Sequence, residues 1–521
     1  MNHLLTISDA VAAHARLNPG KLGTRDSRRS LTYAEWDRRA SRLAGSLLAL
    51  GLKRGDRVGV LAYNCVEWME IYVGLARAGL VAVPLNFRLS APEIAYILGN
   101  CEAAALIAGP EFVDIVAPVR GEIGIAPNRY VVLDEQPRDG WQSYETLLDA
   151  TDAPREFASV GADETCALMY TSGTTGRPKG AIRSHAGSTL IAFATALEMG
   201  FSAEDTGLLV MPMCHANSLY FGTTFVHMGA TVVVDDHRSF DPEALLATLA
   251  REKVTFTSLV PTHYIMILAL PEEVKRKYDM STVGKLMISS APARKDTKVA
   301  ILEYFTNGRL YELYGSTEAG WVTLLRPHEQ LHKLGSVGRE WAGSGAIRLL
   351  DVNGQEVPDG EVGELFSRTS YVFDGYWRNP EKTAEAFRGA WCSVGDMARR
   401  DEDGYIWLVD RKSNMIISGG ENIYPSEVEG VIGAHPKVQD VAVIGVPHDK
   451  WGETVQAVIV LREGKQADAG EIQSWCRERL AAFKCPRAVA FIADGDMPRT
   501  ATGKILHRVL RQRFTDSVSL V

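Results

Sequence analysis

Glycines, hydroxyl residues and one lysine crowd into a single segment, Thr171-Ser-Gly-Thr-Thr-Gly-Arg-Pro-Lys-Gly180. Glycines let the backbone turn tightly and approach a ligand closely, while backbone N–H groups, hydroxyls and a cation together bind a polyphosphate. A flexible turn is the ordinary alternative, but this density of such residues is uncommon. Because Pro178 precedes the lysine, the segment is not GxxxxGK[ST], which disfavours a P-loop kinase or GTPase. The residues expected to bind such a polyphosphate are Thr171, Ser172, Gly173, Thr174, Thr175, Gly176 and Lys179.

Three further segments carry groups that suit nucleotide chemistry. Tyr314-Gly-Ser-Thr-Glu318 combines an aromatic ring, a turn and a carboxylate, and Mg²⁺ prefers one or two carboxylates together with phosphate oxygens. Asp396 follows Gly395 and could accept hydrogen bonds from a diol. Lys504 ends Pro498-Arg-Thr-Ala-Thr-Gly-Lys504, where its compact ammonium charge could bridge a carboxylate and a phosphate that otherwise repel each other.

The elements that position these groups alternate between helix and strand. Apolar spacing predicts helices over 34–50 and 66–78 and strands over 57–62, 80–84, 231–234 and 285–290. Such alternation predicts an α/β fold with parallel sheets covered by helices. Turn signals such as Asn353-Gly354 and Asp403-Gly404 predict an antiparallel piece over 346–368 and 404–409.

The last part of the chain forms a smaller pattern of its own. Helices are predicted over 425–433 and 469–482, and strands over 441–446 and 455–461. A chain of 521 residues is too long for one core. We expect a large N-terminal domain over residues 1–411 and a small, mobile C-terminal α+β domain over residues 412–521.

Composition narrows the class of protein. Hydrophobic residues make up 46%, charged residues 23%, and the net charge is −8, which is ordinary for a globular protein and does not favour nucleic acid as a partner. Seven cysteines occur without a CxxC pair, which argues against a disulfide framework or a zinc site. Neither a signal peptide nor an apolar run long enough to cross a membrane is found. The expected location is the cytoplasm.

Taken in order from residue 171 to Lys504, these segments resemble the motifs of the adenylate-forming superfamily. That superfamily includes acyl-CoA synthetases, the adenylation domains of peptide synthetases, and beetle luciferases. The resemblance covers nearly the whole chain. It implies that Tyr314 packs on adenine and that Glu318, with Thr174 nearby, binds Mg²⁺. The further nucleotide-binding residues that it implies are Ser290, Ala291, Pro292, Glu312, Leu313, Gly315, Ser316 and Thr317.

The resemblance also implies roles for residues nearer the C-terminus. Asp396 would bind the ribose hydroxyls, although Val394 stands where the family's TGD motif has threonine. Arg411 would bind ribose or phosphate oxygens, and Gly420 belongs to a glycine-rich loop that follows. Ser413 occupies the pivot position, where the family usually has Asp or Lys. Lys504 would be catalytic for adenylation.

The acid and its acceptor are less well defined by the sequence. His215 resembles a family position beside the substrate carboxylate, in the segment 211–220 where the acid is expected. Other candidate wall residues are Val260, His263, Leu313, Gly315 and Trp321. No second cation marks a dicarboxylic acid, so we expect a fatty or aryl monocarboxylic acid.

The expected activity is that of an acyl-CoA synthetase using ATP, Mg²⁺ and CoA. Trp451 and Lys484 are expected to contact CoA. The main alternative is a stand-alone adenylating enzyme that loads a carrier protein. A luciferase-like oxygenase and a nucleotide-binding pseudoenzyme are weaker alternatives. The sequence does not decide between a monomer and a homodimer.

Overall fold

The computed structural model describes residues 5–138, 140–150, 157–171, 177–289, 293–341, 343–418, 421–448, 450–500 and 503–518, without the side chains of residues 422 and 516–518. The chain forms two compact units. One comprises Met1–Ala346 and Ser367–Cys392, and the other comprises Ile347–Phe366 and Ser393–Val521.

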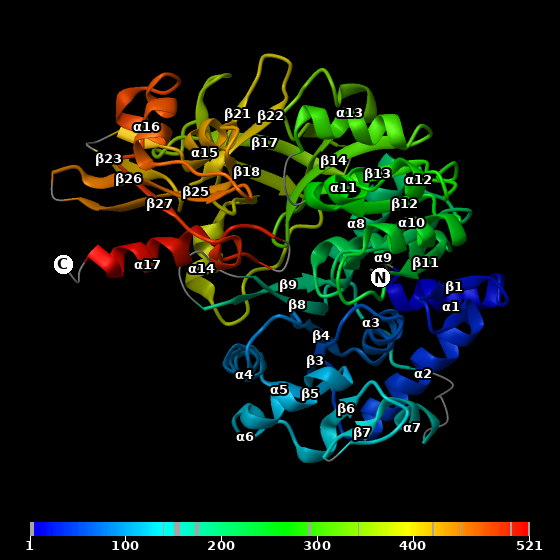
Figure 1. The fold of residues 1–521 in the computed structure, drawn as a ribbon. Helices are drawn as coiled ribbons and strands as arrows, with labels where there is room; N and C mark the ends of the chain where they lie inside the picture. The colour runs from blue at the N-terminus through cyan, green and yellow to red at the C-terminus, as the bar shows by residue number, and fades with distance from the viewer. Residues whose placement is uncertain are drawn as a thin grey trace. The chain divides into compact units, whose positions relative to one another are not determined.

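The first unit is built on two largely parallel sheets (Figure 1). One has the order β7-β6-β5-β3-β4-β8-β9 and the other β16-β15-β14-β13-β12-β10-β11-β1-β2. The strands of the first are β3 (Arg57–Leu61), β4 (Val81–Pro84), β5 (Ala103–Ala108), β6 (Tyr130–Val132), β7 (Gln142–Ser143), β8 (Thr165–Thr171) and β9 (Lys179–Ser184). Those of the second are β1 (Leu22–Arg25), β2 (Ser30–Thr32), β10 (Thr206–Leu209), β11 (Thr231–Val234), β12 (Phe256–Leu259), β13 (Lys285–Ser289), β14 (Arg309–Ser316), β15 (Gly320–Leu325) and β16 (Arg339–Glu340).

Helices pack between these two sheets and on their outer faces. The helices are α1 (Ile7–Leu17), α2 (Tyr33–Ala49), α3 (Glu67–Ala78), α4 (Ala91–Asn100), α5 (Val113–Val116), α6 (Arg120–Ile123), α7 (Tyr144–Asp149), α8 (His185–Met199), α9 (Ala216–Met228), α10 (Pro242–Arg251), α11 (Pro261–Leu268), α12 (Glu272–Lys275), α13 (Lys295–Tyr304) and α14 (Pro380–Ala386). On β11, Val232 and Val234 join the core shared with α2, α3 and α9, while Val233 joins the core under α10, α11 and α13. This alternation follows from the two-residue period of a strand.

The second unit packs helices on both faces of an antiparallel hairpin, β25 (Val438–His448) and β26 (Gly452–Leu461). Val441 and Val443 face the core with α15 (Pro425–Gly433) and α16 (Ala469–Arg477), whereas Ala442 and Ile444 face α17 (His507–Val518). The other strands are β21 (Asp396–Arg400), β22 (Ile406–Arg411), β23 (Ile416–Ser418), β24 (Glu421–Ile423) and β27 (Ala488–Phe491). Two strands, β17 (Ser344–Leu350) and β18 (Val362–Thr369), extend across the boundary between the two units. The strands β19 (Phe387–Arg388) and β20 (Trp391–Cys392) belong to the first unit.

The structure confirms the predicted α/β class and the antiparallel piece, in which β21 pairs with both β18 and β22. The helix predicted over 469–482 is shorter, because the chain must turn back after Arg477 to bring β27 alongside β26 in parallel. The compact units also divide the chain differently from a boundary after Arg411. Residues 347–366 and 393–411 group with the C-terminal part, to which Asp410 is tied by the Ser426 N–H at 2.8 Å.

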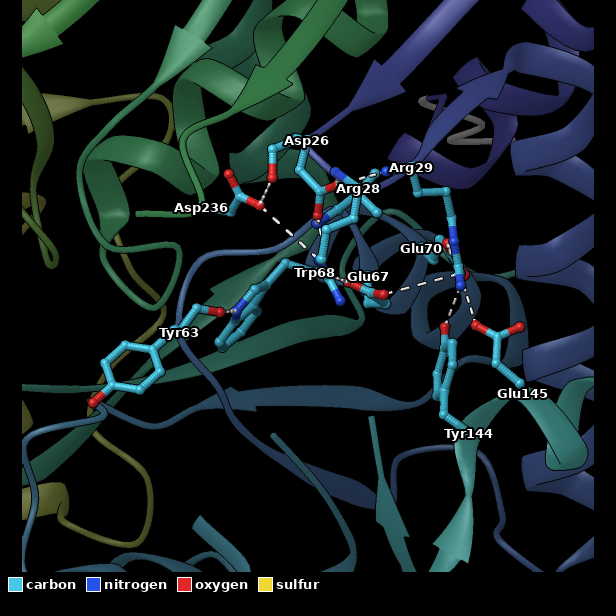
Figure 2. A network of polar contacts seen from close by, with 12 residues as sticks. Asp26, Arg28, Arg29, Tyr63, Glu67, Trp68, Glu70, Tyr144, Glu145 and Asp236 are labelled. Carbon is cyan, nitrogen blue, oxygen red and sulfur yellow. Dashed lines mark hydrogen bonds and ion pairs between the residues drawn. The ribbon is translucent and has the colours of Figure 1, made fainter. Parts of the chain in front are cut away.

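A network of charges ties the N-terminal segment to α3 and α7 (Figure 2). The Glu70 carboxylate is fully buried and accepts hydrogen bonds from Arg39 Nε at 3.0 Å and from the Tyr144 hydroxyl at 3.1 Å. Glu145 joins both Arg29 and Arg39. Burial raises the pKa of Glu70 to about 7 despite the charge of Arg39. This network joins α2, α3 and α7 through hydrogen bonds between Arg39, Glu70, Tyr144 and Glu145.

All seven cysteines are free thiols, as the sequence indicated. In the described part of the chain no helix has the length and apolar character needed to cross a membrane.

Candidate active site

Two antiparallel strands flank the expected phosphate-binding segment. β8 ends at Thr171 and β9 begins at Lys179, and these two residues are paired across the hairpin. Gly180 packs closely on the Tyr170 ring, since a Cβ there would lie 3.0 Å from that ring. Ser172, Gly173, Thr174, Thr175 and Gly176 lie outside the described residues. The hairpin therefore fixes both ends of the segment.

Glu318 lies beside this hairpin, directly after β14. Its side chain is buried, with 7% exposure. Its Oε1 atom accepts hydrogen bonds from the Thr171 hydroxyl at 3.2 Å and from the Tyr376 hydroxyl at 2.9 Å. Its backbone carbonyl accepts from Phe373 N–H at 2.8 Å and from Arg183 at 3.3 Å.

These contacts suit a carboxylate that must hold a hard cation. Both hydroxyl donors reach Oε1, so Oε2 is left, among the described residues, as an oxygen that can ligate Mg²⁺. Burial strengthens such an interaction by excluding water. The donor set therefore fits a magnesium ion shared with phosphate oxygens.

Lys179 reaches the same place from the other strand. Its Nζ lies 4.2 Å from the centre of the Tyr376 ring, a cation–π contact. Burial lowers the pKa of Lys179, and Glu318 opposes this shift only in part. A half-buried cation thus stands next to a buried carboxylate at the mouth of the loop.

The predicted nucleotide segment on β14 is only partly accessible. Tyr314, Ser316 and Thr317 keep part of their surface exposed, and Gly315 is exposed. Gly315 cannot be replaced without rearrangement, because a Cβ would lie 2.3 Å from the Gly320 carbonyl oxygen. Ser290, Ala291 and Pro292 are not among the described residues.

Glu312 and Leu313 differ from their neighbours on β14 because both are buried. The Glu312 carboxylate forms an ion pair with Lys298, which is also buried. Burial raises the pKa of Glu312, opposed by Lys298. The Glu312 carboxylate is thus paired with a cation inside the protein, and a nucleotide contact by this residue stays a prediction.

His215 precedes α9 at the end of a segment that other elements clamp. Asn64 accepts from the Met213 N–H at 2.8 Å and donates to the Met211 carbonyl at 3.2 Å. The Tyr72 hydroxyl donates to the Met213 carbonyl at 2.9 Å. These contacts fix the backbone that leads to His215. The His215 residue itself is partly exposed.

The candidate residues of the second unit gather around one ion pair. Asp396 is buried, and its Oδ1 lies 3.1 Å from Arg411 Nε, across the antiparallel register of β21 and β22. Gly395 has a φ of +81°, a conformation that favours glycine. Burial by surrounding protein and the charge of Arg411 lower the pKa of Lys504, and Asp396 opposes them. Three predicted residues, Asp396, Arg411 and Lys504, therefore share one electrostatic environment.

The loop that carries Lys504 is closed by its own backbone. The Thr500 N–H donates to the Lys504 carbonyl at 2.7 Å, and the Lys504 N–H donates to the Thr500 hydroxyl at 3.1 Å. The Leu506 N–H donates to the Pro498 carbonyl at 2.8 Å. Lys504 as a residue keeps much of its surface exposed, although the protein around its ammonium group partly desolvates that charge. The loop is thus a compact turn that presents a lysine.

The residues expected to contact CoA have different surroundings. Trp451 is partly exposed, with Lys450 at 4.7 Å and Arg487 at 5.3 Å from its ring centre. Lys484 instead donates to both carboxylate oxygens of Glu427 at 2.7 Å. Its charge is therefore already balanced. Gly420 is not among the described residues.

Some residues that shape the site were missed in the sequence. Arg183 is almost fully buried, and it donates to the backbone carbonyls of Thr317, Glu318 and Tyr371. An arginine that follows Ala181 and Ile182 in β9 was a usable signal. Tyr376 and Asn64 contact residues that are distant in the chain, and neither belongs to a recognisable motif.

Comparisons with known proteins identify the family of this chain. Residues 11–377 match the model of the AMP-binding enzyme family, and residues 427–504 match that of the AMP-binding enzyme C-terminal domain. The chain is 39% identical over 506 residues to a feruloyl-CoA synthase of Amycolatopsis sp, covering 96% of this chain and 97% of that protein. It is 35% identical to an indoleacetate–CoA ligase of Aromatoleum aromaticum, covering 98% of each.

A solved structure gives the same result in three dimensions. The anthranilate CoA ligase AuaEII, in complex with anthranoyl-AMP, superposes with a TM-score of 0.87 at 28% identity over 99% of both chains. The chain belongs to the AMP-binding enzyme family, within the adenylate-forming superfamily. Within it, the protein is an AMP-forming acyl-CoA synthetase.

Proposed function

We propose that this enzyme activates an aryl monocarboxylic acid with ATP and transfers the acyl group to CoA. The observation that carries the proposal is the buried Glu318 carboxylate, fixed by Thr171 and Tyr376 beside Lys179 at the mouth of the glycine-rich loop. The aryl class is supported by relatives that are named for ferulate, indoleacetate and anthranilate.

In the first step a carboxylate oxygen attacks the α-phosphorus of ATP, the bond to the bridging oxygen breaks, and pyrophosphate leaves. Lys504 reduces the repulsion between the two anions, and the loop with Lys179 holds the phosphates. Glu318, with Thr174, would hold Mg²⁺, which supplies positive charge to the phosphates. Asp396 orients the ribose, with Arg411 fixing its carboxylate.

In the second step the thiol sulfur of CoA attacks the acyl carbonyl, the thiol proton leaves, and AMP is released. His215 lies beside the acyl group, and Trp451 stacks on CoA. Residues 412–521 rotate about Ser413 between the two steps, which removes Lys504 from the reacting atoms.

The test is a pyrophosphate-release screen over aryl and fatty acids, with and without CoA. We expect acid-dependent ATP–pyrophosphate exchange, and an acyl-CoA product when CoA is added. Formation of acyl-AMP without any thioester would instead indicate a carrier protein as acceptor. If no acid stimulates release of AMP and pyrophosphate, the proposal is wrong.

A further inference from the structure

Three polar side chains form a closed triangle at the carboxyl ends of β12 and β13. Asn217 Nδ2 donates to Ser258 Oγ at 3.0 Å and to Ser289 Oγ at 3.1 Å, and the two serine oxygens lie 3.3 Å apart. Both serines are buried, with 4% exposure each, whereas Asn217 is partly exposed. The two serines thus hold the amide nitrogen of Asn217, and part of this residue remains exposed.

The sheet register explains why the two serines meet. β12 and β13 are parallel, and Ser258 is paired with Met287. Ser289 lies two residues beyond Met287, so its side chain is on the same face as that of Ser258. Ligands of parallel α/β sheets bind at the carboxyl ends of the strands, and both serines lie at this edge.

The same hydrogen bonds also fix the direction of the amide oxygen of Asn217. Because Nδ2 is engaged with both serines, Oδ1 must point to the opposite side of the planar group. Within the described residues no hydrogen bond to Oδ1 is found. An oriented acceptor of this kind needs a donor when a ligand covers it, since an unsatisfied buried acceptor is costly.

Asn217 also has a defined relation to the expected acid position. It lies two residues after His215, in the first turn of α9, beyond the segment clamped by Asn64 and Tyr72. The amide is therefore attached to the same fixed backbone that carries the residue expected beside the acyl group.

From this geometry we infer that Asn217 is a specificity-determining residue whose Oδ1 accepts a hydrogen bond from the acid substrate. The substrate class is an aryl acid that carries a hydroxyl, amino or ring N–H donor. The inference rests on the proposed function and adds to it the chemistry of the acid's substituent. Ser258 and Ser289 act as positioning residues for the amide.

The experiment compares acids that differ only in the donor. Cinnamates with a hydroxyl at the 2-, 3- or 4-position are each paired with the methoxy compound, which lacks the donor, and with unsubstituted cinnamate. We expect at least one hydroxy isomer to exceed its methoxy partner in kcat/KM by about tenfold, the size of one well-made hydrogen bond.

Substitutions test whether this preference for a hydroxyl group comes from the Asn217 amide. Asn217→Leu keeps a similar size without the acceptor, and the ratio of hydroxy to methoxy kcat/KM should fall toward one. Asn217→Asp keeps an acceptor oxygen and should keep the preference. Ser289→Ala should reduce it, and serves as a second variant if Asn217→Leu does not fold.

The matched control is Asn307→Leu. Asn307 donates to the Ser281 carbonyl and precedes β14, at the amino edge of the same sheet, so its replacement should leave the ratio unchanged. Equal kcat/KM for every hydroxy and methoxy pair would overturn the inference, as would a preference that survives in Asn217→Leu. Activity with any of these acids upholds the proposed function independently of the ratio.

Discussion

At the scale of single residues, the candidate site depends on side chains whose charge is held by neighbours. Glu318 is oriented by two hydroxyl groups, and Asp396 is fixed by Arg411. Such pre-orientation removes the cost of arranging charges at the moment of reaction. Substitutions of these side chains should therefore alter turnover more than stability.

Lys504 gives the most direct prediction at this scale. Lys504→Ala should lower ATP–pyrophosphate exchange by about two to three orders of magnitude, because one charge that stabilises the transition state is lost. Thioester formation from supplied acyl-AMP should be retained. Lys465→Ala, which removes an exposed lysine from the loop after β26, is the control. Equal loss of both half-reactions would contradict a role confined to adenylation.

Glu318 and Tyr376 form a second pair of predictions. Glu318→Gln removes a negative charge from the proposed metal site, so the Mg²⁺ concentration for half-maximal adenylation should rise at least about tenfold. Tyr376→Phe removes the hydrogen bond to Oε1 and leaves the carboxylate charge in place, so it should have a smaller effect. Titration of activity with Mg²⁺ measures both. A larger defect in Tyr376→Phe than in Glu318→Gln would argue against metal binding by Glu318.

At the scale of elements, helix α2 offers a matched comparison of two ion pairs. Arg39 pairs with the fully buried Glu70, whereas Arg42 pairs with Asp149, whose side chain is 77% exposed. Arg39→Met leaves a buried carboxylate without its main partner and should cost roughly 3 kcal/mol or more. Arg42→Met should cost less than about 1 kcal/mol. Thermal unfolding of the two variants gives the comparison, and equal shifts in Tm would refute the assignment.

Helix α17 gives the pH prediction. His507, its first residue, lies 2.6 Å from Glu429 of α15. Burial opposes charging of the ring, but the hydrogen bond and charge of Glu429, together with Asp410 of β22, raise the pKa of His507. A raised pKa in the folded state stabilises the fold below about pH 6.5, and this contribution is lost as the pH rises through the higher folded value.

The stability advantage of the wild type over His507→Gln should therefore be largest near pH 6 and shrink toward pH 9. Thermal unfolding at a series of pH values measures it. Glu429→Gln should remove the same pH dependence, because it removes the partner charge. A constant difference between wild type and His507→Gln across this range would show that the pair is not charged in the fold.

At the scale of the whole molecule, the candidate residues are divided between the two compact units. The phosphate hairpin, Glu318 and His215 belong to one, and Asp396, Arg411 and Lys504 belong to the other. The proposed rotation about Ser413 would take place within the second unit, between Arg411 and Lys504. Ser413 is exposed and lies in a turn directly after β22, where large backbone changes meet little steric resistance.

Ser413→Pro tests that rotation, because proline fixes φ near −65°. We expect thioester formation to fall much more than ATP–pyrophosphate exchange, since only the second half-reaction needs the rotated arrangement. Ser413→Ala is the control and should behave as wild type. If Ser413→Pro supports both half-reactions at the wild-type rate, rotation about this residue is not required.

The sequence alone determined the class of fold and most of the motif positions. Apolar periodicity predicted α2, β3, α3, β11 and α15 closely, because burial of one face dictates that period. The loop was predicted because unusual residue types stand close together in the chain, whereas the roles of Glu318, Asp396 and Lys504 were predicted from the resemblance of their motifs to those of the family.

Only the tertiary structure decided which of the charged side chains are paired with an opposite charge, and which residues hold the site residues in place. Glu312 and Lys484 looked available, but the fold pairs them with Lys298 and Glu427. Tyr376 and Arg183 reach Glu318 from distant segments, and Ser258 and Ser289 meet Asn217 only through the register of two strands. Partners far apart in the chain leave no local pattern, because their contact is created by packing and not by spacing.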